Sequence, residues 1–242
     1  MQTIRADIVG SLLRPPWLLK AQQDIAAGTM SAAAFKAIED RAVDEAVGLQ
    51  EEAGLEVVTD GEVRRQSFQS QMTAAVDGFG ECPLEAFVWG DWHGDEEVGD
   101  FSQERPATLG AVKKLTRRRH LSVDELTYLR GRTNRIPKVT LPSPGLWANF
   151  WSPQHSRQSY PTLDHFLGDV TDILRDEVAE LVRLGATYIQ LDAPHYALLI
   201  DPKTRSFYES QGWGLDRWLT QGIEMDNAVM GDFPGVTFGF HL

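Results

Sequence analysis

The stretch Gly185-Ala-Thr-Tyr-Ile-Gln-Leu-Asp-Ala-Pro194 decides the predicted fold, because an apolar run ends here on an acidic residue. The segment that begins at Thr162 has apolar residues at helical spacing and ends at the glycine of this stretch. The same order of helix, glycine, apolar strand and ionisable residue occurs over residues 31–62 and again over residues 215–241. Strands that are apolar on both faces and alternate with helices indicate a parallel sheet covered by helices.

Six strands are predicted, at residues 4–11, 55–60, 107–115, 137–141, 186–192 and 236–241. No Gly-x-Gly-x-x-Gly motif follows any of them, which disfavours an open sheet that binds dinucleotides. Ionisable residues directly follow three of the strands, at the end where barrel enzymes hold their active sites. The pattern favours one domain over residues 1–242, a TIM-type (β/α) barrel that lacks its last two strands. Residues 66–106 fit no repeat and are predicted to form a long excursion over one mouth of the barrel.

Composition excludes several classes of protein. The chain has 23 Lys and Arg against 35 Asp and Glu, a net charge of −12, which argues against nucleic acid or an anionic membrane as main partner. The single cysteine, Cys82, cannot form an internal disulfide and has no assigned role. The sequence also contains neither a secretory signal pattern nor an apolar run long enough to span a membrane. We therefore expect a soluble, cytoplasmic protein.

Glu62 and Asp192 are the strongest catalytic or substrate-binding candidates by position alone. An acidic residue just past a parallel strand points into the mouth of the barrel, where it can bind a substrate ammonium or transfer a proton. The alternative is that these acids cap the next helix or pair with Arg64 and Arg65. Gly10-Ser11, after the first strand, offers backbone N–H groups and a hydroxyl that suit a substrate carboxylate.

Histidines and aromatic residues supply weaker candidates. His241 follows the last strand, where an imidazole can bind a metal or act as a base, and His195 follows Asp192 by three residues. Trp151 lies on a loop after the 137–141 strand, where an aromatic ring can stack on a flat substrate or simply pack on the barrel rim. Ser122 and Glu125 match a capping box that would open a short helix.

Five ordered motifs resemble the catalytic domain of cobalamin-independent methionine synthases, most closely the short, single-domain members. They are Val9-Gly-Ser-Leu-Leu-Arg-Pro-Pro16, Val57-Val-Thr-Asp-Gly-Glu62, Val139-Thr-Leu-Pro-Ser-Pro144, Tyr188-Ile-Gln-Leu-Asp-Ala-Pro194 and Phe238-Gly-Phe-His241. This resemblance implies a TIM barrel and a zinc ion that activates a thiol for methyl or other alkyl transfer, with homocysteine or another small thiol as acceptor. Zinc lowers the pKa of a bound thiol, and the resulting thiolate is the nucleophile.

The resemblance also assigns roles to individual residues. Gly10, Ser11 and Glu62 would hold the amino-acid substrate, and Asp192 would face the same amino-acid or thiol pocket. By the same resemblance Trp151 would lie near the methyl donor. His195 stays a candidate substrate-binding residue through its position alone.

Two departures from the family pattern bear on substrate and metal. Ala193 stands where the family has a second carboxylate, which puts homocysteine and folate in doubt as acceptor and donor. His241 matches the first zinc ligand, and the family's remaining Cys, Glu and Cys ligands have no match in residues 1–242. We therefore expect those ligands to come from a further C-terminal segment or from a partner chain.

Two other functions are compatible with the sequence. A metal-free enzyme like uroporphyrinogen decarboxylase, which shares the superfamily barrel, would use arginines near the first strand, where Arg5 and Arg14 are available. Alternatively, the chain is a split or truncated subunit that needs a partner chain for zinc and activity. Zinc content separates the metal-free enzyme from the zinc enzyme.

Overall fold

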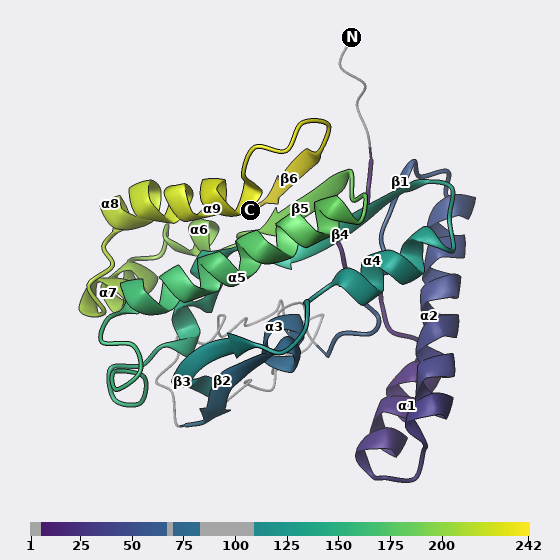
Figure 1. Cartoon of the computed structure of the whole chain (residues 1–242), viewed down its shortest axis with the longest axis horizontal. Coiled ribbons are helices and arrows are strands. Elements are labelled where there is room, and N and C mark those ends of the chain that lie inside the picture. The colour runs from purple at the N-terminus through teal and green to yellow at the C-terminus, as the bar shows by residue number, and fades with distance from the viewer. Residues whose placement is uncertain (1–5, 67–69, 83–108) are drawn as a thin grey trace, which may run out of the picture.

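The computed structural model describes residues 6–66, 70–82 and 109–242 (Figure 1). Its strands are β1 (Val57–Val58), β2 (Val76–Glu81), β3 (Leu109–Arg117), β4 (Ile136–Pro142), β5 (Tyr188–Asp192) and β6 (Thr237–His241). Its helices are α1 (Pro16–Ala26), α2 (Ala32–Glu52), α3 (Ser70–Ala75), α4 (Val123–Arg130), the 3₁₀ helix η1 (Pro144–Phe150), α5 (Leu163–Arg183), α6 (His195–Leu198), α7 (Pro202–Ser210), α8 (Leu215–Arg217), the π-helical turn η2 (Trp218–Gly222) and α9 (Ile223–Met230).

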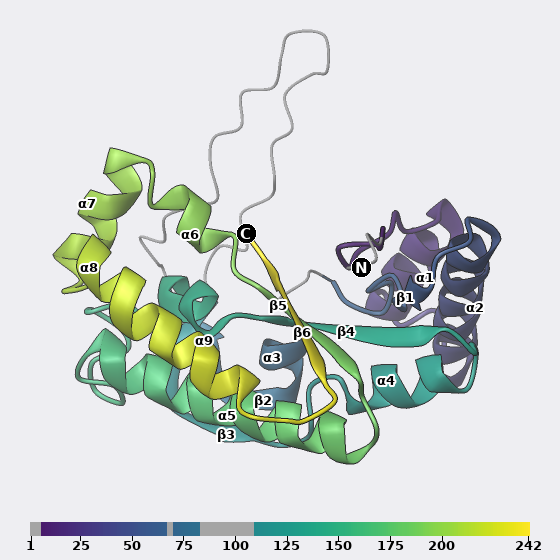
Figure 2. The ribbon, with the colours of Figure 1, turned by 90° about the horizontal axis from the view of Figure 1, so that it is seen from above.

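A parallel sheet forms the centre of the fold, with the strand order β1-β4-β5-β6. Its strands match four of the predicted ones, and each follows a helix or loop as the repeat pattern indicated. Helices α5 and α9 lie side by side along one face of this sheet (Figure 2). The architecture is therefore mixed α/β with parallel strands, and the described residues do not show closure into a barrel.

The main core lies between α5 and the parallel sheet. Apolar residues at helical spacing on α5 are fully buried, and they pack with buried residues of β4 and β5. These are Phe166, Leu167, Val170, Leu174, Val178, Leu181, Val139, Leu141, Ile189 and Leu191. Burying one such side chain stabilises a fold by about 1.5–3 kcal/mol, so this layer fixes where the carboxyl ends of the strands lie.

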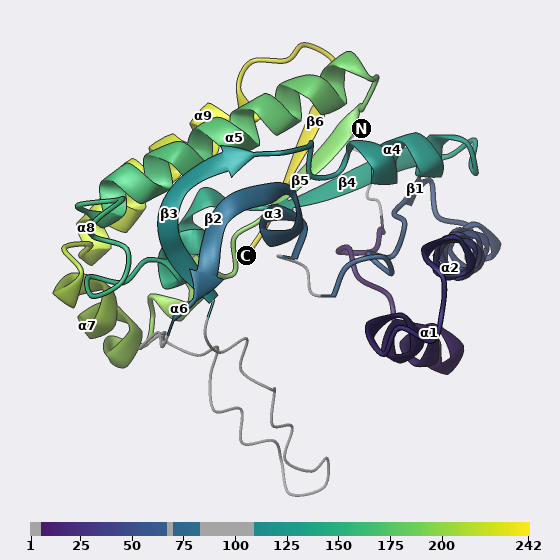
Figure 3. The same cartoon turned by 60° about the horizontal axis from the view of Figure 1, so that its bottom comes forward.

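A second, smaller core joins α1 and α2 to the edge of the sheet (Figure 3). Its buried members include Leu18 of α1, Val43 and Val47 of α2 and Val58 of β1. Ser31 is the N-cap of α2, because its hydroxyl accepts a hydrogen bond from the backbone N–H three residues on at 3.2 Å. This packing holds β1 and the loop that follows it.

The strand predicted at 107–115 does not belong to the parallel sheet. The structure places β3 antiparallel to β2 in a separate two-stranded sheet, with Phe79 opposite Ala111 (Figure 3). The excursion predicted at 66–106 begins with α3 and β2, and β2 then supplies β3 with a neighbour close in sequence. Pairing with a strand that is close in the sequence costs little loop entropy. β3 therefore pairs with β2, although the repeat pattern gave β3 a place in the barrel sheet. The rest of the excursion, residues 67–69 and 83–106, lies outside the described residues.

The strand predicted at 4–11 is also wrong for its described part. Residues 6–11 run along the sheet without forming a strand, and residues 4–5 lie outside the described residues. Side chains of the sheet hold this segment in place: Gln190 Nε2 donates to the Val9 carbonyl at 2.7 Å. The apolar pattern implied backbone hydrogen bonds between this segment and a neighbouring strand. Hydrogen bonds from polar side chains of the sheet take their place.

Within the part of the chain that the structure describes, no helix is both long and apolar enough to cross a bilayer.

Candidate active site at the carboxyl ends of the parallel strands

The turn after β1 has an unusual backbone. Gly61 has φ +70° and Glu62 has φ +52°, so two consecutive residues adopt the left-handed conformation, which costs a non-glycine residue about 1 kcal/mol or more. Two hydrogen bonds hold the turn: Asp60 Oδ1 accepts the Glu62 N–H at 2.9 Å, and Thr59 Oγ1 accepts the Gly61 N–H at 3.0 Å. Thr59 Oγ1 also donates to the Gly10 carbonyl at 2.9 Å. The strained turn directs the Glu62 side chain inward, against residues 10–11.

The Glu62 carboxylate is only 2% exposed and is surrounded by donors. The hydroxyls of Ser11 and Thr140 donate to its two oxygens, and Arg65 Nη1 lies 3.1 Å from Oε1. A Cβ atom on Gly10 would collide with the carboxylate, so only glycine fits at that position. The predicted grouping of Gly10, Ser11 and Glu62 is thus present in the structure.

The alternative role for Glu62, pairing with an arginine, is also realised through Arg65. Arg64 instead pairs with Asp40 and Glu39 of α2. Arg65 is buried and makes two bonds to Glu125, at 3.1 Å from Nε and 2.7 Å from Nη2. The surrounding carboxylates raise the pKa of Arg65 although burial opposes them. A charge-assisted, two-point contact of this kind fixes the guanidinium against Glu62.

The capping box predicted from Ser122 and Glu125 is not formed. Ser122 makes no capping bond, and its hydroxyl instead accepts from Gln71 Nε2 at 2.6 Å. Glu125 turns toward the buried Arg65 because a buried guanidinium needs a counter-ion more than the first turn of α4 needs a cap. Arg65 is thus one of the two arginines that the sequence offered as partners, whereas no sequence pattern pointed to Glu125 as a support of the site.

Asp60 lies beneath this network. Burial, reinforced by the negative charge of Glu125, raises its pKa to about 6, while the positive charge of Arg65 acts in the opposite direction. Its Oδ2 atom is buried and has no hydrogen-bond partner in the structure. Asp60 thus stabilises the turn through Oδ1, while no hydrogen bond from the described residues offsets the burial of Oδ2.

Asp192 and His241 form the second half of the site. They are paired in register at the ends of β5 and β6, and His241 Nδ1 lies 3.1 Å from Asp192 Oδ1. Gln190 Nε2 donates to the same oxygen at 2.7 Å. Burial raises the pKa of Asp192, and the nearby charge of Glu62 adds to this, while the hydrogen bonds from Gln190 and His241 oppose it.

The two halves meet through neighbouring residues on β4 and β5. Thr140, which holds Glu62, pairs in register with Gln190, which holds Asp192. Residues paired in this way project on the same face of adjacent parallel strands. The site therefore combines two carboxylates, an imidazole and a serine hydroxyl at one end of the sheet.

Two predicted residues lie away from this cluster. His195 is 1% exposed, and its ring centroid lies 4.3 Å from that of the tilted Tyr196 ring and 5.3 Å from that of the edge-on Trp218 ring. Among the described residues neither of its ring nitrogens has a hydrogen-bond partner, and burial lowers its pKa to about 3. Trp151 is buried in the main core, where its indole N–H donates to the Tyr160 carbonyl at 3.0 Å. The structure brings neither side chain to Glu62 or Asp192.

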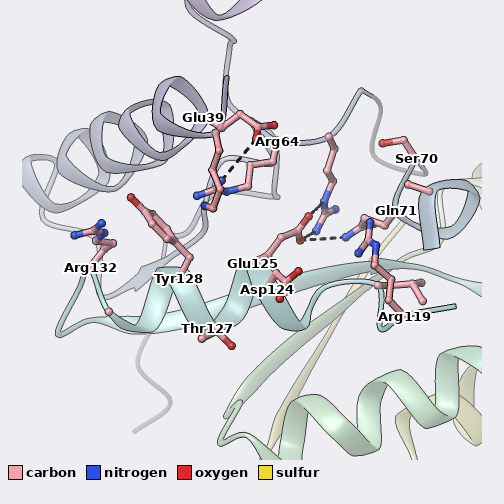
Figure 4. A pocket seen from close by; sticks show the side chains of 15 residues that line it. Glu39, Arg64, Ser70, Gln71, Arg119, Asp124, Glu125, Thr127, Tyr128 and Arg132 are labelled. Carbon is pink, nitrogen blue, oxygen red and sulfur yellow. Dashed lines mark hydrogen bonds and ion pairs between the residues drawn. The ribbon is translucent and has the colours of Figure 1, made fainter. Parts of the chain in front are cut away.

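A separate cleft of about 760 Å³ opens between α2, α3 and α4 (Figure 4). Its lining includes both acidic and basic side chains. The guanidinium carbons of Arg64 and Arg132 each lie 4.5 Å from the ring centroid of Tyr128. Arg65 and Glu125 form part of its lining and connect it to the support of Glu62. Cys82 lies elsewhere and is buried, which raises the pKa of its thiol.

A zinc ion would find only part of a ligand set here. Across residues 6–66, 70–82 and 109–242, no group of three or more His, Cys, Asp or Glu side chains could hold a metal. His241 offers one imidazole, with Asp192 on its Nδ1 atom. The described residues therefore do not form a complete zinc site by themselves.

Comparisons with known proteins agree with the motifs. The chain is 31% identical over 189 residues to a protein named methionine synthase from Pyrococcus abyssi, covering 77% of this chain and 51% of that protein. It is 28% identical over 242 residues to the uncharacterized protein YxjH of Bacillus subtilis, covering 98% and 61%. A B12-independent methionine synthase from Shewanella sp. W3-18-1, solved in complex with selenomethionine, matches with TM-score 0.70 and 18% identity over 98% of this chain and 61% of that one. The resemblance to cobalamin-independent methionine synthases is confirmed.

This methionine synthase-like chain spans 61% of the YxjH protein and 51% of the Pyrococcus protein. No protein-family model matches it. At 18% sequence identity, the match to the Shewanella structure supports the fold alone. Within that fold, the methionine synthase-like motifs that contain Ser11, Glu62, Asp192 and His241 are the segments that come together.

Proposed function

We propose that this chain is the substrate-binding part of a methyltransferase of the cobalamin-independent methionine synthase type. Its complete form would close into a (β/α) barrel and transfer a methyl group to the thiol of homocysteine or a similar small thiol. One observation carries the proposal: Glu62 and Asp192 are brought to one end of the sheet through the paired residues Thr140 and Gln190. The names of the relatives and the selenomethionine bound to the Shewanella protein support it.

The two carboxylates suit the α-ammonium group of an amino acid. A buried pair of like charges is costly, and a cation between them would offset that cost. The segment at Gly10 and Ser11 would take the α-carboxylate through its backbone N–H groups, since the Ser11 hydroxyl already donates to Glu62. The thiol would then point toward His241.

Zinc would activate that thiol by lowering its pKa. We propose His241 as one ligand through its Nε2 atom, because Nδ1 faces Asp192. A histidine ligand commonly donates its other ring N–H to a carboxylate in this way. The remaining ligands would come from residues outside these 242, in the same polypeptide or in a partner chain. The expected cytoplasmic location stays a prediction.

The alternative of a metal-free decarboxylase gains no support from the arginines that it requires. Arg14 donates to the backbone carbonyls of Glu62 and Arg65 and so is used inside the fold. Arg5 lies outside the described residues. The split-subunit alternative is compatible with the zinc proposal and is tested with it.

Calorimetric titration with L-methionine tests the amino-acid site. We expect binding by the purified chain, and about tenfold or greater weakening for 4-(methylthio)butanoic acid and for 3-(methylthio)propylamine, which lack the ammonium and carboxylate groups respectively. Equal affinity for all three compounds would contradict the proposal. So would the absence of binding by a chain whose circular dichroism spectrum and cooperative unfolding show that it is folded.

Native mass spectrometry, with zinc measured on the same sample, tests the metal. We expect the 27.0 kDa species to lack stoichiometric zinc and any larger species that supplies the other ligands to hold it. His241→Ala should then remove zinc from the larger species, because one ligand of a four-coordinate site is lost. Stoichiometric zinc that survives this substitution would exclude His241 as a ligand.

A further inference from the structure

A fully buried lysine lies one layer below the proposed site. Lys138 of β4 has a side chain that is 0% exposed. Its Nζ atom contacts Gln190 Oε1 at 2.9 Å, Asp7 Oδ2 at 3.2 Å and the Ile8 carbonyl. Burying an ammonium group costs several kcal/mol unless acceptors compensate it, so a lysine that is retained here calls for an explanation. The proposed substrate contacts do not use it.

Lys138 fixes the orientation of the Gln190 amide. An ammonium group can only donate, so the amide oxygen must face Nζ and the NH2 group must point the other way. The two N–H bonds of that NH2 group go to Asp192 Oδ1 and to the Val9 carbonyl, each at 2.7 Å. A flipped amide would place donors against Nζ and lose both bonds. The orientation of Gln190 therefore follows from the charge beside it.

The oriented amide determines which oxygen of Asp192 stays available. Oδ1 accepts from Gln190 and faces His241 Nδ1 at 3.1 Å. In the described part of the chain, Oδ2 accepts no hydrogen bond, and it is the oxygen left for an incoming ammonium group. The same amide bond to Val9, with the Lys138 bond to Ile8, holds the segment that leads to Gly10.

We propose that Lys138 and Gln190 are positioning residues that set the spacing between the Gly10–Ser11 and Asp192–His241 halves of the amino-acid site. They act through Val9 on one half and through Asp192 on the other, without touching substrate. This inference rests on the proposed function for its ligand. Its structural content, the fixed hydrogen bond between Asp192 and His241, can be tested without any ligand.

The first test is a double-mutant cycle with Lys138→Met, Gln190→Met and the combined variant, read by calorimetric titration with L-methionine. Each single substitution should weaken binding about tenfold, as expected when a hydrogen bond to a charged group is lost. It should weaken the binding of 4-(methylthio)butanoic acid less, because that compound lacks the ammonium group that Asp192 would hold. The double variant should be no weaker than the weaker single variant, since the residues act in series. Methionine affinity within twofold of the unmodified chain in both single variants would overturn the proposal.

The second test is ¹⁵N NMR of the His241 ring at pH 8. We expect the proton on Nδ1 in the unmodified chain and a tautomer mixture in Lys138→Met and Gln190→Met, because Asp192 is then free to rotate. An unchanged tautomer in both variants would overturn the proposal even if the chain bound no methionine. Failure of methionine binding with the expected tautomer change would overturn the proposed function alone.

Glu177→Gln provides a matched control for stability. Glu177 of α5 is fully buried and accepts from the backbone N–H groups of Leu121 and Ser122 at 2.8 and 2.7 Å, and among the described residues it makes no hydrogen bond to Lys138, Gln190 or Asp192. Its substitution should lower the free energy of unfolding while leaving both the methionine affinity and the His241 tautomer unchanged. A change in either readout would mean that they follow stability and not position, which would count against the proposal.

Discussion

Glu62→Gln is expected to weaken L-methionine binding by about 100-fold or more. The substitution keeps the size of the side chain but removes the charge that would face the α-ammonium group, and loss of a charged partner in a buried site costs about 3–5 kcal/mol. It also places an amide NH2 group among donors, since Ser11, Thr140 and Arg65 all donate to this carboxylate. Calorimetric titration of the variant at pH 7.5 measures the effect.

Glu125→Gln is the matched control for this substitution. Both acids pair with the same Arg65 guanidinium, and Glu125 is on the side away from the proposed ligand, in the wall of the cleft between α2, α3 and α4. Both variants should therefore lose comparable stability in urea unfolding, while only the Glu62 variant loses methionine affinity. If the Glu125 variant lost as much affinity, the effect would come from Arg65 and not from a contact between Glu62 and the ligand.

The sequence predicted which residues come together better than it predicted the topology. The positions of Glu62, Asp192 and His241 follow from a local pattern, an apolar strand that ends on an ionisable residue, and parallel strands bring such ends together. The β2–β3 pairing has no such local signal, because the loop entropy between two successive strands, and not the pattern of either strand, favours it. Residues 6–11 were predicted as a strand because their apolar pattern does not distinguish ladder bonds from side-chain bonds.

The supports of the site could not be predicted for a related reason. Arg65 and Glu125 are 60 residues apart, and Lys138 and Gln190 are 52 apart, so nothing local links either pair. Lys138 and Gln190 carry one signal in hindsight: each is a polar residue at an inward position of an otherwise apolar buried strand. Such a residue must find a polar partner inside the fold, and the pairing of β4 with β5 decides which one. Trp151 illustrates the opposite error, since a loop aromatic packs in a core as readily as on a substrate.

Asp60→Asn is expected to stabilise the fold at pH 8 by about 1–3 kcal/mol and to have little effect near pH 3.5. Asp60 has a pKa raised to about 6 by burial and by Glu125, against an ordinary value of 3.8. The folded state therefore holds this proton more tightly than the unfolded state does. The contribution of Asp60 to stability is full below about pH 4 and is lost as the pH rises through 6.

The asparagine side chain removes that loss because it never ionises. Its oxygen can still accept the Glu62 N–H, which Asp60 Oδ1 accepts at 2.9 Å, so the strained turn is kept. Its NH2 group would occupy the place of Oδ2, which has no partner in the structure. The free energy of unfolding in urea, measured for both proteins from pH 3.5 to 8, should show a difference that grows between pH 4 and 6.

Asp201→Asn should behave in the opposite way. Asp201 is the N-cap of α7, and its bonds to the backbone N–H groups of Lys203 and Thr204 lower its pKa, so its ionised form stabilises the fold. At pH 8 the free energy of unfolding of that variant should be lower than that of the unmodified chain, and the difference should shrink as the pH falls. If Asp60→Asn also destabilised the fold at pH 8, the ionised Asp60 carboxylate would be a net favourable partner of Arg65. The buried position of Asp60 would then be maintained by its attraction to the Arg65 charge and not in spite of the buried charge.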